Sequence, residues 1–263
     1  MSELDSVGLA PVTDDDLAVQ AASTYLRCMV AGDVGPLRKI LARDVVVHDP
    51  RVGRVEGAAV LPFLEQTQRW LRDHDAELES VRTTSAGGRA VEESVVRFKR
   101  VELPIAIVAE AGPSGVGSLR IYHSNFPITG GHVERRPILV ENPELALPDV
   151  AAAYQRALAE GDVDAMLALY EETGTAREPS AYLYEGKEEL RIYYGALFAN
   201  DGGIAVERAQ FIDDGACCAL EYNVLRWGKT TLAPQPGLSV YQRGASGKLA
   251  SARIYHDVDP PLS

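Results

Sequence analysis

Two carboxylates are the residues of this sequence best suited to moving a proton. Asp49 precedes Pro50 and Glu178 precedes Pro179, and the two carboxylates stand 129 positions apart. A carboxylate beside an apolar wall is poorly solvated, which raises its pKa toward the range where it can exchange protons at neutral pH. The alternative is that Asp-Pro and Glu-Pro only form turns after a strand.

Two tyrosines accompany the carboxylates with the same spacing. Tyr25 and Tyr154 also stand 129 positions apart, each in a segment with helical periodicity. A tyrosine hydroxyl aimed at a developing negative charge in a dry pocket stabilises that charge by ~2–4 kcal/mol. A carboxylate and a phenol in one such pocket would supply a proton acceptor and a hydrogen-bond donor. The alternative is that both tyrosines are core residues with satisfied hydroxyls.

The shared spacing belongs to an internal duplication. A pattern of tyrosine, glycine, proline and glycine occurs twice at a constant offset: Tyr25, Gly32, Pro50, Gly57 and Tyr154, Gly161, Pro179, Gly186. The offset becomes 133 where Arg-Ile-Tyr-His recurs, at 120–123 and 253–256. A repeat this long predicts two whole domains of roughly 120 residues each. We expect a loose tail over 1–12, domains over 13–125 and 149–263, and an ordered linker over 126–148.

Composition excludes several classes of function. The net charge is −12 and the pI about 4.9, which disfavours a nucleic-acid partner. The apolar runs are too short to span a membrane, and the acidic beginning is unlike a signal peptide, so we expect a cytoplasmic protein. The three cysteines show neither a disulfide framework nor metal-ligand spacing.

Each copy is predicted to contain three helices and then a run of strands. In the first copy we expect helices at 17–32, 33–41 and 57–71, and strands at 45–47, 76–84, 90–100, 103–110 and 117–124. In the second we expect helices at 149–160, 162–170 and 186–199, and strands at 175–178, 204–212, 217–227, 236–243 and 248–256. This order is typical of an α+β fold in which a mostly antiparallel sheet curls around the helices.

The element order and the repeated spacing resemble the nuclear-transport-factor-2-like (NTF2-like) superfamily of cone-shaped α+β domains. Within it, the chain is similar to the SnoaL-like polyketide cyclases and the ketosteroid isomerases. The resemblance implies that Asp49 and Glu178 stand where those isomerases hold their base. It places Tyr25 and Tyr154 where the oxyanion-binding tyrosine stands. Tyr170 and Tyr194 match two supporting tyrosines that the first copy lacks.

One feature of the isomerases is missing from both copies. The second oxyanion donor is replaced by Ala106 in the first copy and by Ser239 in the second. This difference argues against steroid isomerisation itself, and Ser239 remains a candidate ligand contact. Because the second copy keeps the tyrosine cluster, we expect it to be the more active one.

Further carboxylates suggest a second chemistry. Glu79 and Glu207 fall on matching strands, and an Asp–Glu pair across a pocket resembles epoxide-opening cyclases, where one acid protonates the epoxide and the other deprotonates the attacking hydroxyl. The alternative is a solvated strand edge. Glu92 and Glu221 recur at one further strand position, where they line either the pocket or the contact between the halves.

The histidines favour contact roles over metal binding. His48, beside Asp49, is a candidate ligand contact, and the other ligands of a metal site are not evident. In Arg-Ile-Tyr-His, Arg and Tyr share one strand face and His occupies the other, and we expect the motif to have a structural role between the two sheets.

The sequence thus predicts a small-molecule pocket protein that performs isomerisation or ring closure without a cofactor. Its expected substrate is an apolar, oxygenated molecule of the polyketide, terpenoid or steroid type. The alternative is a ligand-binding or scaffold protein that keeps the cone and has lost the chemistry. The fused copies are expected to pair in one chain as a pseudo-two-fold dimer, the whole being a monomer or a homodimer.

Overall fold

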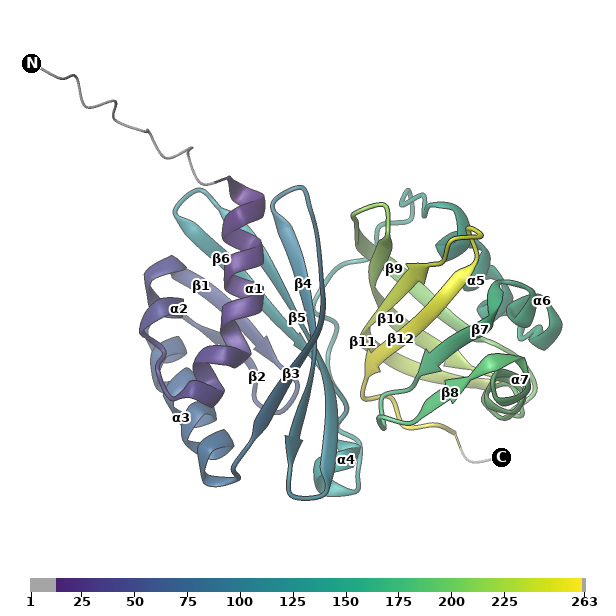
Figure 1. The fold of residues 1–263 in the computed structure, drawn as a ribbon, viewed down its shortest axis with the longest axis horizontal. Coiled ribbons are helices and arrows are strands. Elements are labelled where there is room, and N and C mark those ends of the chain that lie inside the picture. The colour runs from purple at the N-terminus through teal and green to yellow at the C-terminus, as the bar shows by residue number, and fades with distance from the viewer. Residues whose placement is uncertain (1–12, 262–263) are drawn as a thin grey trace, which may run out of the picture.

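The computed structural model describes residues 13–261, so the tail expected over 1–12 lies outside the described residues. Within that range the chain forms two six-stranded sheets that stand face to face, each with its own helices on the side away from the other sheet (Figure 1). The architecture is α+β, with two tandem curved-sheet domains, as the sequence predicts.

The first half begins with its longest helix. Thr13 caps α1 (Asp14–Ala31) by accepting a hydrogen bond from the Asp16 amide, while the Asp16 carboxylate accepts from the Thr13 amide. Gly32 ends this helix with a φ of 82°, a conformation that favours glycine. The remaining elements are α2 (Gly35–Ile40), β1 (Leu41–Asp49), β2 (Gly53–Glu56), α3 (Val60–Asp73), β3 (Glu77–Ala86), β4 (Arg89–Phe98), β5 (Val101–Gly112) and β6 (Gly115–Tyr122).

The second half repeats this order. Its elements are α5 (Asp149–Glu160), α6 (Val163–Ala168), β7 (Tyr170–Arg177), β8 (Leu183–Glu185), α7 (Gly186–Leu197), β9 (Ile204–Asp213), β10 (Cys217–Trp227), β11 (Thr230–Arg243) and β12 (Leu249–His256). The strand orders are β2-β1-β6-β5-β4-β3 and β8-β7-β12-β11-β10-β9, the same arrangement twice. In each sheet one pair is parallel, β1 with β6 and β7 with β12, and the other pairs are antiparallel.

Each sheet has an inner and an outer face. The inner face of the first sheet packs against its helices in a core that includes Ala21, Met29 and Leu119, and the second half has an equivalent core. The outer faces meet in a third apolar cluster, to which Val91 and Val108 contribute from one half and Val240 from the other.

Most expected elements are found close to their predicted positions, with differences at the first strand of each copy. The strand β1 begins at Leu41, where a helix was expected to continue, and β7 begins at Tyr170 instead of 175. Both strands pair in parallel with the last strand of their sheet, a contact far away in sequence that local periodicity cannot show. The short strands β2 and β8 were not expected either.

The segment between the two sheets begins with a short helix, α4 (Phe126–Thr129). It then follows the second sheet, where the Asn142 amide donates to the Arg208 carbonyl (2.8 Å) and the Asn223 amide donates to the Leu139 carbonyl (3.2 Å). No helix among the described residues has the length and apolar character needed to cross a membrane.

Candidate functional site

A cavity of about 130 Å³ lies inside the first half, between the inner face of the sheet and the helices. Three polar side chains that could take part in proton transfer line it: Tyr25 from α1, Asp49 from the end of β1, and His123 from the residue after β6. The other polar lining residues are Arg51, Gln66 and Thr67. The rest of its wall is mostly apolar and includes Trp70 and Ile105. The carboxylate and the tyrosine that the sequence singles out in the first copy therefore line one cavity.

Strand alternation explains why Asp49 enters the cavity. Val45 and Val47 point into the core of the first half, so Asp49 lies on the same face two residues later. Its Oδ1 accepts from the backbone amides of Arg51 (2.8 Å) and Val52 (3.1 Å). This turn fixes the carboxylate at the cavity wall and leaves Oδ2 without a partner among the described residues.

His123 is held in one tautomer by the backbone. Its Nδ1 lies 3.0 Å from the Ser124 carbonyl, which can only accept, so Nδ1 carries the proton and donates. Burial lowers the pKa of His123, which keeps the ring neutral at neutral pH. The neutral ring therefore has a lone pair on Nε2, which can accept a hydrogen bond or a proton.

Tyr25 is a hydrogen-bond donor, in contrast to the acceptor His123 Nε2. Burial raises its pKa well above the ordinary value, and the nearby charge of Asp49 raises it further. Its hydroxyl is therefore protonated at any physiological pH and can donate to an oxygen in the cavity. Donor, carboxylate and imidazole lone pair give the cavity the groups needed for acid/base chemistry.

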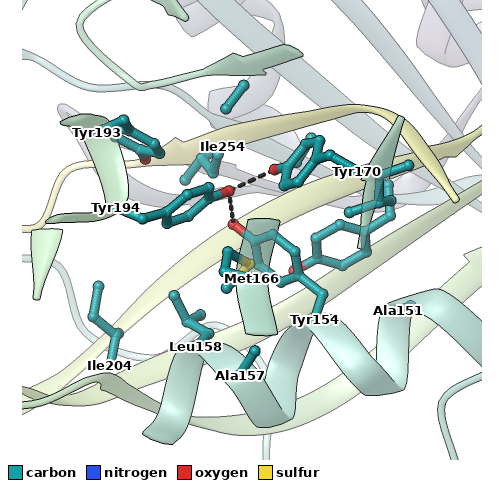
Figure 2. Close-up of a cluster of buried hydrophobic side chains, with 14 of the residues drawn as sticks. Ala151, Tyr154, Ala157, Leu158, Met166, Tyr170, Tyr193, Tyr194, Ile204 and Ile254 are labelled. Carbon is teal, nitrogen blue, oxygen red and sulfur yellow. Dashed lines mark hydrogen bonds between the residues drawn. The ribbon is translucent and has the colours of Figure 1, made fainter. Parts of the chain in front are cut away.

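The equivalent tyrosine of the second half has different surroundings. The Tyr194 hydroxyl is hydrogen-bonded to the hydroxyls of Tyr154 (3.1 Å) and Tyr170 (2.5 Å), as Figure 2 shows. All three rings are buried among core residues such as Met166 and Ile254. Burial raises the pKa of Tyr154 to about 12. The Tyr194 hydroxyl therefore links the other two hydroxyls inside the core.

Glu178 does not join these tyrosines. It lies half-buried in a separate pocket together with Tyr193 and His256, and its carboxylate accepts from the Ser180 hydroxyl (2.5 Å). The expected meeting of Tyr154 and Glu178 in one site is thus not what the structure shows, because the strand end that carries Glu178 lies at the edge of the tyrosine core.

Three other candidates lie on outer sheet faces. Glu79 is exposed and forms an ion pair with Arg97. Glu207 contacts the Asn223 amide (3.5 Å), and His48 pairs in register with Arg120 on the face opposite to Asp49. Strand alternation turns all three away from the inner cavities, so neither Glu79 nor Glu207 is brought together with a proline-flanked carboxylate.

Glu221 lies between the two halves. Its carboxylate accepts from Arg120 Nε (2.7 Å), from Arg120 Nη2 (3.0 Å) and from the Tyr122 hydroxyl (2.7 Å). The reciprocal contacts join Glu93 to Arg253 Nε (2.6 Å) and to the Tyr255 hydroxyl (2.9 Å). Arg and Tyr of the repeated motif therefore act between the sheets.

The residue of the first half that corresponds to Glu221 in the structure is Glu93. The sequence alignment, which matches Glu221 with Glu92, is therefore off by one residue. Glu93 is in register with Ala106, and Glu221 is in register with Leu238, the strand neighbours that face the other half. Glu92 instead faces the interior of the first half, where it accepts from the Thr83 hydroxyl (2.5 Å).

A one-residue error in aligning the two copies also affects the expected position of the second oxyanion donor. Ser239 lies inside the second half, where its hydroxyl and that of Tyr222 are 3.0 Å apart. Ala106 faces the other half, so it does not correspond to Ser239. Ile107 occupies the matching inward position, since it is in register with Glu92 and Ile121.

His123 is the site residue that sequence reasoning missed. The signal was present, because in Arg-Ile-Tyr-His the histidine falls on the face opposite to Arg120 and Tyr122, which is the cavity face. Among residues 13–261, no three histidine, cysteine, aspartate or glutamate side chains gather as a possible metal site.

A curved six-stranded sheet with three helices packed in it, present twice, defines a tandem α+β protein of the NTF2-like type. In sequence, residues 150–252 match the SnoaL-like domain family, which confirms the expected resemblance for the second half. No curated protein matches the sequence significantly. The family match covers less than half of the chain.

Three solved structures are each similar to less than half of the chain. A protein from Kribbella flavida has 22% identity and a TM-score of 0.38, covering 43% of this chain and 92% of its own. A ketosteroid-isomerase-like protein from Catenulispora acidiphila, solved in complex with trimethylamine, has 16% identity and a TM-score of 0.38, covering 44% and 90%. A ketosteroid-isomerase-like protein from Erwinia carotovora has 19% identity and a TM-score of 0.33, covering 42% and 92%.

Proposed function

We propose that the first half is a cofactor-free acid/base site for a small, apolar, oxygenated molecule, which it isomerises by proton transfer next to a carbonyl. The observation that carries this proposal is the presence of Tyr25, Asp49 and His123 around one cavity with an apolar wall. Asp49 Oδ2 takes the proton from carbon and returns it to a second carbon. The Tyr25 hydroxyl donates to the enolate oxygen that forms in between.

His123 has the role of a positioning group for the substrate. Its unprotonated Nε2 accepts a hydrogen bond from a hydroxyl group of the bound molecule, which turns the reacting carbon toward Asp49. The cavity volume of about 130 Å³ is below the ~300–1,000 Å³ usual for drug-sized ligands. The substrate is therefore on the order of a single ring, smaller than a steroid.

In this proposal the second half supports the first structurally and does not carry out the reaction. Its three tyrosine hydroxyls share two hydrogen bonds inside the buried core, and Glu178 lies in a pocket apart from them. The pairing of the two halves in one chain replaces a contact that separate domains would make as a dimer. A protein that only binds the same class of molecule in the first cavity is the rival function.

Solvent deuterium incorporation into small cyclic enones and lactones, followed by mass spectrometry, tests the proposal. Asp49→Asn removes the base, so we expect the exchange rate to fall by about 10²–10⁴. Tyr25→Phe removes the oxyanion donor, and we expect a fall of about 10²–10³. If Glu178→Gln abolishes exchange while Asp49→Asn leaves it intact, the active half is the second one. Ligand binding without any exchange in the wild type favours the rival function.

A further inference from the structure

The pocket that contains Glu178 is a second, separate space. Its volume is about 370 Å³, within the range of ~300–1,000 Å³ typical of ligand pockets. Both parts of the chain contribute to it: Phe126 and His132 come from the segment that follows the first sheet, and Glu178, Tyr193, Trp227 and His256 come from the second half. The acid/base site of the first half uses none of these residues.

The wall of this pocket is rich in aromatic rings. Phe126 and His132 stack with ring centroids 5.0 Å apart, and Trp227 meets His256 edge to face at 6.4 Å. The Trp227 Nε1 donates to the Leu197 carbonyl (2.7 Å), so the polar edge of the indole is already occupied within the protein. The ring surfaces, which carry negative π density, are what these residues offer to a ligand.

The charges around the pocket have one sign. Glu178 and Asp259 contribute carboxylates, and none of the described residues that line the pocket is lysine or arginine. The Glu178 carboxylate accepts from the Ser180 hydroxyl and has the Tyr184 hydroxyl beside it, and a carboxylate has further lone pairs for a ligand. The pocket therefore combines π surfaces with the Glu178 carboxylate, which has no lysine or arginine beside it in the pocket wall.

His256 does not cancel that charge. The Val258 amide donates to His256 Nδ1 (3.2 Å), so the ring proton of the neutral form lies on Nε2. Burial lowers the pKa of His256 to about 4, which keeps the ring neutral at neutral pH. Nε2–H is a donor for an oxygen atom on the ligand.

We propose that this pocket binds a small organic ammonium cation that carries methyl groups on nitrogen. The methylated nitrogen packs against the aromatic rings, which attract cations through their π faces, and the Glu178 carboxylate neutralises its charge. A hydroxyl or carbonyl group on the same molecule accepts from His256 Nε2–H. The inference is independent of the proton transfer proposed for the first half.

Calorimetric titration with choline, at concentrations up to about 10 mM, tests the proposal. The matched probe is 3,3-dimethylbutan-1-ol, in which carbon replaces the charged nitrogen without a change of shape. We expect choline to bind at least about tenfold more tightly than this neutral alcohol, a difference of about 1.4 kcal/mol. Equal affinity for the two probes, or no binding of choline, would overturn the proposal.

Two substitutions locate the binding event. Glu178→Gln is expected to weaken choline binding about tenfold, and Phe126→Leu, at a side chain that is 45% exposed, is expected to weaken it without unfolding the protein. The control is Glu188→Gln, which removes the same charge from an exposed position of α7 and is expected to leave binding unchanged. Choline affinity that is insensitive to both Glu178→Gln and Phe126→Leu places the cation elsewhere and contradicts the assignment.

Discussion

At the scale of single residues, the two copies differ most in the hydrogen-bond partners of equivalent polar groups. His123 and His256 have the same place in the repeated motif, yet His123 donates from Nδ1 to a carbonyl and His256 accepts at Nδ1 from an amide. Tyr25 faces a cavity, whereas Tyr154 is bonded to Tyr194. Duplicated residues have thus acquired different chemistry through their neighbours.

The tyrosine cluster gives a prediction for stability. Tyr194→Phe removes the hydroxyl that links Tyr154 and Tyr170, leaving two buried hydroxyls without it. We expect the free energy of unfolding to fall by about 1–3 kcal/mol in urea titrations, the usual cost of unpaired buried polar groups. Tyr25→Phe is the matched control, because its hydroxyl faces a cavity, and it should cost less. Equal losses would contradict a structural role for the second cluster.

At the scale of elements, much of the fold follows from the sequence because helix and strand periodicity are local. The constant offset reveals two copies, and the alternation in Arg-Ile-Tyr-His divides its residues between two faces of the sheet without showing which face meets the other half. The early starts of β1 and β7 were missed because they depend on parallel pairing with distant strands. The filling of the tyrosine core was also missed, because it depends on three elements meeting in space.

The segment α4 and the residues after it are held by one carboxylate of the second half. Asp257 accepts from the Ser124 hydroxyl, from the amide and side chain of Asn125, from His132 Nδ1 and from the Val133 amide, at 2.7–3.1 Å. Although burial by itself raises the pKa of Asp257, these bonds hold it below the ordinary value. The residue that follows β12 therefore positions the segment that contributes to the walls of both pockets.

Asp257→Asn tests this role. The asparagine side chain has the size of the aspartate but no charge, and its NH2 group faces groups that are themselves hydrogen-bond donors. We therefore expect the free energy of unfolding to fall by about 2–4 kcal/mol. Hydrogen exchange should increase over 124–133 in particular. Asp259→Asn, at an exposed neighbouring carboxylate, is the control. Unchanged protection over 124–133 would show that other contacts hold the segment.

At the scale of the whole molecule, two buried ion pairs connect the sheets. Arg120 binds Glu221 and Arg253 binds Glu93, each pair supported by a tyrosine from the same motif. Burial raises the pKa of Glu221, but Arg120, Tyr122 and Gln210 together hold it below the ordinary value. The contact is therefore ionised at neutral pH, and its stabilisation is lost as the pH falls through this lowered pKa.

Removal of one partner should destabilise the protein more than removal of both. Glu221→Ala leaves the Arg120 charge buried without compensation, and we expect a loss of about 3–5 kcal/mol in the free energy of unfolding. The double change Glu221→Met with Arg120→Met replaces the pair by apolar side chains of similar length, and it should recover most of that loss. A double variant as unstable as the single one would mean that the ion pair itself, not the unpaired charge, sets the stability.

The central claim is that the two copies now present opposite chemistry, a proton acceptor in the first cavity and a hydrogen-bond donor in the second pocket. Long-range ¹H–¹⁵N correlation spectra of the imidazole rings measure this directly, with His123→Gln and His256→Gln variants to assign the signals. We expect His123 to carry its proton on Nδ1 and His256 to carry it on Nε2 near neutral pH. The same tautomer in both rings, or a protonated ring in either, would contradict the account.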